Sequence, residues 1–109
     1  MIDYTVKQQD TVHFTIGESS YWQSFNSSYK MHDFKMLWLV HPELMQPVTN
    51  VVFEEVNQDI TIVVDDIILF VAIAEKYPQL NIKVLSRNRK LLTHFADVGY
   101  PDNLSVVLI

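Results

Sequence analysis

Hydrophobic and polar residues alternate through the first segment of the chain, DYTVKQQDTVHFTIG (residues 3–17). Alternation is the pattern of a β-strand with one buried face, and here the polar run KQQD interrupts it. The alternating apolar residues are Tyr4, Val6, Val12, Phe14 and Ile16. Because a polar turn between two alternating runs is typical of a hairpin, we expect two antiparallel strands that end at Gly17.

The aromatic residues of the next segment have the spacing of one helical face. Trp22, Phe25 and Tyr29 fall at i, i+3 and i+7, and a serine before them is a suitable N-cap. We therefore expect a helix near residues 19–31. The run KMLWLV that follows is compatible with the end of this helix or with a strand. HPELMQP, which contains two prolines, predicts a loop.

From residue 48 onward the chain alternates between strand-like and helix-like segments. VTNVVFEEV and ITIVV are rich in β-branched residues and predict two strands. Good helix-forming residues then predict a helix over residues 66–77, which Pro78 ends.

Another strand, NIKVLS, follows that helix. It precedes a helix over residues 87–98, for which Ser86 is the expected N-cap and Gly99 the left-handed residue after its end. LSVVLI predicts the last strand. Strands that alternate with helices of about a dozen residues indicate a mainly parallel sheet in this half. At 109 residues, the chain is expected to form a single α/β domain (1–109), a sandwich of a mixed sheet with helices.

Composition narrows the classes of function. The formal net charge is −5, which opposes general binding to nucleic acid. Cysteine is absent, so disulfides and thiolate metal sites are excluded. The polar, acidic start MIDYTVKQQD is unlike a signal peptide, which favours the cytoplasm. Hydrophobic residues make up 49% of the chain and charged ones only 19%, so we expect a partner protein or a second copy to cover part of the surface.

Two adjacent acids, Asp65 and Asp66, interrupt an apolar run over residues 60–74. The run is too short to span a membrane, and two aspartates near its centre oppose insertion. In the simplest interpretation the acids cap the following helix and offset the positive charge at its start. Because α/β sheets bind ligands at the carboxyl ends of strands, these acids are also the best position for a site that a partner would contact.

The aromatic residues between positions 21 and 38 are the most unusual feature of the composition. Large side chains at helical spacing usually belong to the core, but Tyr, Trp and Met are also enriched at the centres of interfaces. We therefore consider Trp22, Phe25 and Trp38 as apolar anchors for a partner. The basic cluster RNRK adds Arg87 and Arg89, which form either a solvated surface or a contact for an acidic partner.

Evidence for catalytic chemistry in the sequence is weak. No serine has the glycine-flanked pattern of a nucleophile, and no glycine-rich loop is present. The pair His94 and Asp97 has i+3 spacing, which is common on solvated helix faces, so we expect neither a metal nor a cofactor. The enzymatic alternative is a small hydrolase or ligand-binding domain that uses Asp65, Asp66 and His94. It requires a pocket in which His94 or His41 lies within hydrogen-bond reach of an aspartate.

Several segments resemble the STAS domain family, the small module of anti-sigma-factor antagonists and of sulfate-transporter tails. VHFTIGES is similar to that family's strand and Gly-Glu turn. VVFEEV followed by TIVVDDIILFVAIAEKY is similar to its central strand, acid-led loop and apolar helix. IKVLSRNRKLLTHFADVGYPDNLSVV is similar to its later strand, helix and glycine-ended exit.

The resemblance covers roughly residues 10–109 and implies a regulatory module that binds other proteins. The family's phosphorylated turn is of the Asp-Ser-Ser type, whereas this chain has Asp65-Asp66-Ile67 there. The resemblance therefore implies that the phosphorylation switch is absent or that Asp66 supplies a fixed charge in its place. We expect a small cytoplasmic protein-interaction or regulatory module without catalytic activity, which contacts a partner protein or forms a homodimer.

Overall fold

Five strands form one mixed sheet in which neighbouring strands follow the order of the sequence, β1-β2-β3-β4-β5. The strands are β1 (Tyr4–Lys7), β2 (Thr11–Ile16), β3 (Asn50–Glu55), β4 (Asn81–Ser86) and β5 (Leu104–Leu108). β1 pairs with β2 antiparallel, and the other three pairs are parallel. The computed structural model describes the chain except for residues 1–3, 17–26, 56–61 and 63–65.

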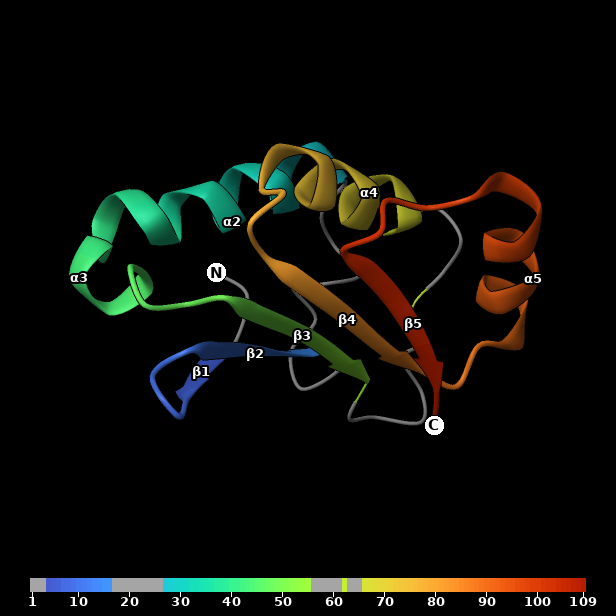
Figure 1. Cartoon of the computed structure of the whole chain (residues 1–109), viewed down its shortest axis with the longest axis horizontal. Coiled ribbons are helices and arrows are strands. Elements are labelled where there is room, and N and C mark those ends of the chain that lie inside the picture. Colours follow the sequence, from blue (N-terminus) through green and yellow to red (C-terminus); the bar gives the residue numbers. More distant parts are fainter. Residues whose placement is uncertain (1–3, 17–26, 56–61, 63–65) are drawn as a thin grey trace.

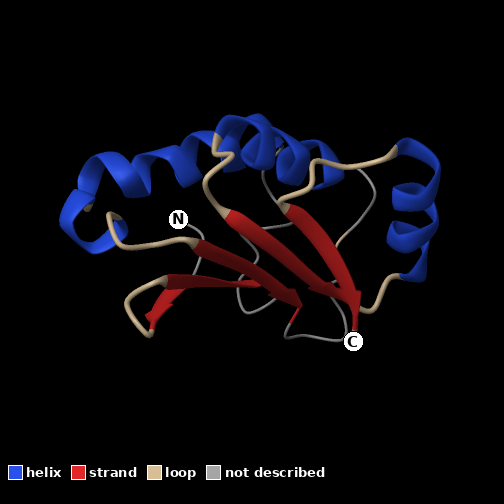
Figure 2. Ribbon diagram, in the orientation of Figure 1, coloured by secondary structure: helices blue, strands red, loops and turns tan. Residues whose placement is uncertain are grey.

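Four helices within the described residues connect the parallel strands. They are α2 (Ser27–Val40), α3 (Pro42–Met45), α4 (Asp66–Lys76) and α5 (Arg89–Val98). Figures 1 and 2 show α2 and α4 side by side along one side of the sheet, α3 at one end of the molecule and α5 beside β5 at the other end. Consecutive crossovers of the same hand place their helices on the same face, which explains the one-sided helix layer. None of these helices is both long and apolar enough to cross a bilayer.

The hydrophobic core fills the space between the helix layer and the sheet. Alternate residues of β2, β3 and β4 point into it, and α2 and α4 supply residues from the other side. At its centre the rings of Phe14 and Phe53 stack with centroids 4.9 Å apart, and Phe34 of α2 and Phe70 of α4 pack against this pair. The alternation of the sequence therefore corresponds to one buried face of the sheet.

The other face of the sheet carries mostly polar side chains that the described helices leave uncovered. The strand register aligns Thr11, Asn50 and Asn81 in one row across three parallel strands. In the next row Lys83 is exposed and lies opposite Val52 and Ser105. A parallel sheet is usually covered on both faces, so a face that none of the described helices covers is unusual for this topology.

The structure confirms the α/β class and the mixed sheet, and the predicted hairpin is present as β1 and β2. Gln8 and Gln9 of its turn have positive φ angles of 57° and 67°. The helix predicted at 66–77 is α4, and Gly99 follows α5 with φ of 78°.

The run KMLWLV, whose sequence is compatible with the end of a helix or with a strand, is helical, because the helix predicted at 19–31 continues to Val40, while residues 17–26 lie outside the described part of the chain. One local prediction is wrong. The predicted loop HPELMQP contains the single-turn helix α3, because Pro42 occupies its first position, where a missing N–H costs nothing. The predicted strand 60–64 lies outside the described residues except for Ile62, which is buried and has no strand partner assigned.

Candidate functional site

A buried carboxylate joins the carboxyl ends of β3 and β4. Glu55 is the last residue of β3, and its side chain has no exposed surface. Its Oε2 accepts hydrogen bonds from the backbone N–H of Ile62 (2.8 Å) and from the hydroxyl of Ser86. Its Oε1 accepts one from the backbone N–H of Arg87 (3.1 Å), whose Nε lies 3.8 Å away. Glu55 therefore serves the architecture of this edge of the sheet.

Asn88 extends this network to the start of α5. Its backbone N–H donates to the Ser86 hydroxyl (3.0 Å), and its side-chain amide donates to the carbonyl of Ile62 (2.9 Å). Its Oδ1 accepts from the backbone N–H of Lys90 (3.1 Å). The residue that caps α5 is thus Asn88, and the prediction of Ser86 is wrong because α5 begins at Arg89, so that Asn88 is the residue directly before the helix.

Asp66 forms a buried ion pair between two helices. It is the first residue of α4, where negative charge offsets the helix dipole. Its Oδ1 lies 3.1 Å from Nζ of Lys30 on α2, and the two side chains are only 7% and 4% exposed. A partner has no access to Asp66 in this arrangement, so its interpretation as a surface contact is corrected. Asp65 lies outside the described residues.

Of the three predicted aromatic anchors, the structure describes Trp38 alone. Trp22 and Phe25 lie outside the described residues. Trp38 is partly buried, and its ring packs at 4.7 Å from that of Phe34 and stacks on Tyr77, so it does not protrude as an anchor.

The two arginines of the basic cluster have different environments. Arg87 pairs with the buried Glu55, and its side chain is partly exposed. Arg89, the first residue of α5, is exposed. The structure therefore brings Arg87 to the buried network and leaves Arg89 on the surface.

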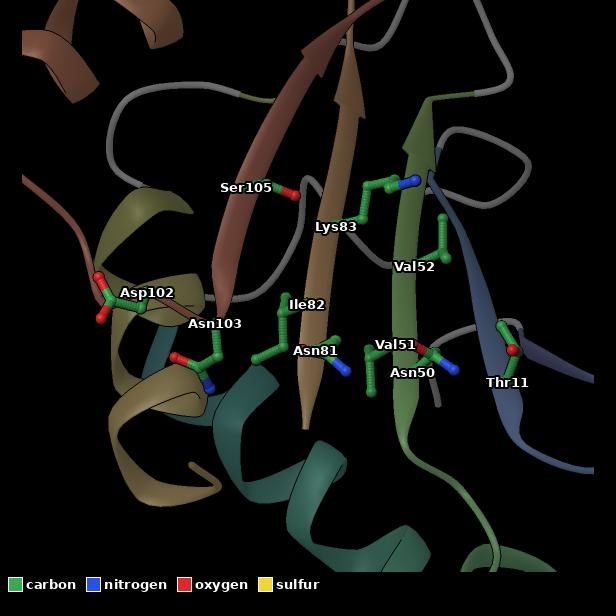
Figure 3. Close-up of a pocket in the computed structure, with 10 residues that line it drawn as sticks. All are labelled: Thr11, Asn50, Val51, Val52, Asn81, Ile82, Lys83, Asp102, Asn103 and Ser105. Atoms are coloured by element: carbon green, nitrogen blue, oxygen red, sulfur yellow. The ribbon is translucent and has the colours of Figure 1, made fainter. Parts of the chain in front are cut away.

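A polar hollow of about 310 Å³ lies at the amino ends of the strands, away from this network. Figure 3 shows Lys83 reaching from β4 toward β3, with Ser105 on the neighbouring strand β5. Other side chains at the hollow belong to Thr11, Asn50, Asn81 and Asp102. Asn103 is also there, but its amide donates to the carbonyls of Ala74, Tyr77 and Leu80 and so connects the end of α4 and the turn after it to the start of β5. The hollow offers hydrogen bonds and one cation, and the sequence analysis missed it.

The geometry that the enzymatic interpretation requires is not formed by the described contacts. A histidine–carboxylate contact exists on the open face, where Nε2 of His13 lies 3.3 Å from Oε2 of Glu54. His41 is exposed beside α3, and Asp66 is paired with a lysine. Within the described residues, no three histidine or acidic side chains are grouped so that they could bind a metal ion.

The exposed apolar surface was also missed by the sequence analysis. All large apolar side chains that are exposed in the described part are aliphatic, and Leu39 on α2 is the most exposed of them at 74%. Val40 and Leu44 are exposed beside it. Together with His41, Pro42 and Glu43, these two residues line a shallow hollow of about 660 Å³. We call Leu39, Val40 and Leu44 the α2–α3 patch.

Comparisons with known proteins give no family for this chain. No protein-family model matches it, and neither the curated proteins nor the solved structures contain a significant match.

Proposed function

We propose that the chain is a small cytoplasmic interaction module that acts through protein contacts and without catalysis. The observation that carries this proposal is the α2–α3 patch, which exposes three aliphatic side chains at one end of the helix layer. Contiguous exposed apolar residues on a small domain typically mark a contact with another macromolecule.

The buried acids support the same conclusion. Glu55 accepts three hydrogen bonds from the chain itself, and Asp66 is paired with Lys30. Carboxylates that act in acid–base catalysis must reach a substrate, whereas these two are inside the protein and hold strands and helices together. Asp66, the described one of the two acids that interrupt the apolar run, is thus better explained by folding than by chemistry.

We propose in addition that the module is of the STAS type. The order β3, α4, β4, α5 and β5, with Gly99 between α5 and β5, supports this assignment. In that comparison Asp66 occupies the position of the family's modified turn. Its buried pairing with Lys30 favours a fixed structural charge over a surface switch.

Site-specific photocrosslinking tests the contact function. A photoreactive amino acid is placed at position 39 in the patch and, in a second variant, at position 68. Ile68 of α4 is a matched control because it is 67% exposed, close to the 74% of Leu39, but lies outside the patch. We expect a discrete covalent adduct in cells from position 39 and none from position 68. A third variant carries the photoreactive amino acid at position 44, and the absence of any adduct from both position 39 and position 44 would refute the contact function of the patch.

A further inference from the structure

We propose that the polar hollow at the amino ends of the strands binds a small polar monocarboxylate, with Lys83 as the charge partner of its carboxylate group. The hollow lies on the sheet face that the described helices leave uncovered, at the opposite end of the strands from the Glu55 network (Figure 3). This site is separate from the α2–α3 patch and does not depend on the contact function of that patch.

The order of the strands favours this face for a ligand. α/β sheets usually bind ligands in a crevice at the carboxyl ends of strands, where the strand order reverses. In this sheet the order β1-β2-β3-β4-β5 does not reverse, and Glu55 with its partners occupies the carboxyl ends of β3 and β4. The face opposite α2 and α4 is free of described helices, and the hollow lies there (Figure 2).

The strand register brings four polar side chains of neighbouring strands together. Asn50 pairs with Asn81 across β3 and β4, and Lys83 pairs with Ser105 across β4 and β5. Asn81 and Lys83 are two residues apart on one strand, so they lie on the same face. Figure 3 shows Lys83 and Ser105 at one level of the sheet and Asn50 and Asn81 at the next. A ligand in the hollow is therefore within reach of side chains from three strands.

The polar groups of Asn81, Lys83 and Ser105 are available to such a ligand. All three residues are exposed, and none of their side chains forms a hydrogen bond or an ion pair within the described part of the chain. The hydroxyl of Thr11, by contrast, donates to Asp10 (2.9 Å). An ammonium, an amide and a hydroxyl supply donors of three kinds, and a carboxylate accepts hydrogen bonds at both of its oxygens.

The charges at the hollow favour an anion with a single negative charge. Among the described residues that line it, Lys83 is the only cation and Asp102 the only acid. Figure 3 shows Asp102 beyond β5 with its carboxylate directed away from Lys83. The acid in the next row of β3, Glu54, contacts His13 at 3.3 Å. One lysine matches one carboxylate, whereas a phosphate monoester carries a charge of about −1.5 to −2, which a nearby acid repels.

The size and composition of the hollow limit the rest of the ligand. Its volume of about 310 Å³ is at the lower end for small-molecule sites. Val52 lies beside Lys83 in the same row and offers an apolar contact. A neutral ligand over Lys83 would remove water from the ammonium without supplying a counter-charge, whereas a carboxylate forms charge-assisted hydrogen bonds. We therefore infer a short carbon chain that carries a carboxylate and a hydroxyl group.

The floor of the hollow is formed before a ligand binds. The backbone N–H of Asn81 donates to the carbonyl of Thr49 (2.8 Å), and that of Ile82 donates to the carbonyl of Asn103 (2.7 Å). These bonds connect β4 to its two neighbours at the level of the hollow. A preformed site loses little conformational freedom on binding. With one charge pair and an open face, we expect a dissociation constant in the millimolar range, about 1 mM.

Two-dimensional amide NMR spectra of the purified full chain test the inference. Acetate, L-lactate and D-gluconate are titrated separately at constant ionic strength. Glycerol is the neutral control, and inorganic phosphate is the control with higher charge. We expect saturable shifts with lactate or gluconate, with a dissociation constant of about 1 mM. The shifts should be confined to the backbone amides that line the hollow on β3, β4 and β5, and glycerol should cause none.

Four variants assign the binding to Lys83 and its neighbour. Lys83→Met should weaken binding more than about tenfold because it removes the charge-assisted hydrogen bonds. Lys83→Arg keeps the charge and should stay within about threefold. Asn81→Asp places an acid beside Lys83 at nearly unchanged shape and should weaken binding about as much as Lys83→Met. Lys90→Met is the matched control, because Lys90 is also exposed but lies on α5, beyond the carboxyl end of β4.

Several results would overturn the inference. The first is the lack of a saturable response to all three carboxylates up to about 50 mM. The second is tighter binding of inorganic phosphate than of every carboxylate, which would exclude a monocarboxylate as the ligand. The third is equal weakening by Lys83→Met and Lys90→Met, or shifts spread over the whole surface, since both indicate unspecific attraction of anions. The spectrum of each variant also reports whether it is folded.

Discussion

Replacement of Glu55 by glutamine should strongly destabilise the fold while nearly preserving the shape of the side chain. Glutamine has one acceptor oxygen where glutamate has two. Whichever oxygen becomes an NH₂ group, the backbone N–H of Ile62 or that of Arg87 then faces a donor inside the protein. An unsatisfied buried donor together with the loss of charge-assisted hydrogen bonds amounts to about 3 kcal/mol. For a domain of this size, that corresponds to a decrease in Tm of about 10–20 °C.

Glu54→Gln is the matched control, because Glu54 is the preceding residue and points to the opposite face. Its side chain is 33% exposed and contacts His13 at 3.3 Å, so its replacement should cost about 0.5 kcal/mol or less. Urea and thermal unfolding, followed by circular dichroism, measure both variants. Equal unfolding midpoints for the two variants would refute the role of Glu55 at the carboxyl ends of β3 and β4. A decrease of less than about 1 kcal/mol in the free energy of unfolding of Glu55→Gln would refute it as well.

Four further changes test other parts of the structure. Lys30→Met leaves Asp66 buried without its lysine and should lower the free energy of unfolding by about 3–5 kcal/mol. The double variant Lys30→Met/Asp66→Leu should regain most of this loss. Equal losses for the single and the double variant in urea unfolding would contradict this prediction. Gln9→Gly should stabilise the fold by about 0.5 kcal/mol, because glycine adopts the positive φ of this position without the strain that a side chain causes. Gly99→Ala should destabilise the fold by about 1 kcal/mol because alanine is strained at the positive φ of this position. An added Cβ meets no atom within 4 Å, so the backbone conformation alone causes this cost. In the same unfolding experiment, a change of the opposite sign would contradict the prediction for Gln9→Gly or for Gly99→Ala. Burial raises the pKa of Tyr100 to about 12, so its neutral phenol stabilises the fold below pH 10 and this contribution is lost as the pH rises toward 12. An ultraviolet titration of the phenols should lose its latest component in Tyr100→Phe, and an unchanged curve would exclude that assignment.

The elements predicted correctly are those whose signal is local. The signal is a hydrophobic periodicity, a helix-ending residue or a turn sequence, and it lies within about a dozen residues in each of three cases: the hairpin of β1 and β2, the strand β4 and the helix α4. Gly99 is correct for the same reason, because a glycine after an amphipathic helix predicts a left-handed residue without reference to the rest of the chain.

The site residues were predicted less well because their roles depend on contacts between distant parts of the chain. Glu55 and Ser86 are 31 residues apart, and Lys30 and Asp66 are 36 apart. Nothing in the segment VVFEEV distinguishes the buried Glu55 from the partly exposed Glu54 except the alternation itself, which places the two acids on opposite faces. Applied strictly, that alternation assigns Glu55 to the core face and identifies it as an acid in need of buried partners.

The run KMLWLV shows why the contact surface could not be inferred from local pattern. A run of consecutive apolar residues fits a strand buried on both faces as well as a helix buried on all sides. The structure selects the helix, and the core accommodates only the side that carries Leu37 and Trp38. Leu39 and Val40 are exposed, so the core of the chain does not require apolar residues at these two positions. The ambiguity in the sequence and the exposed patch in the structure thus have the same cause, which is a helix with two apolar surfaces, one that packs on its own sheet and one that is exposed.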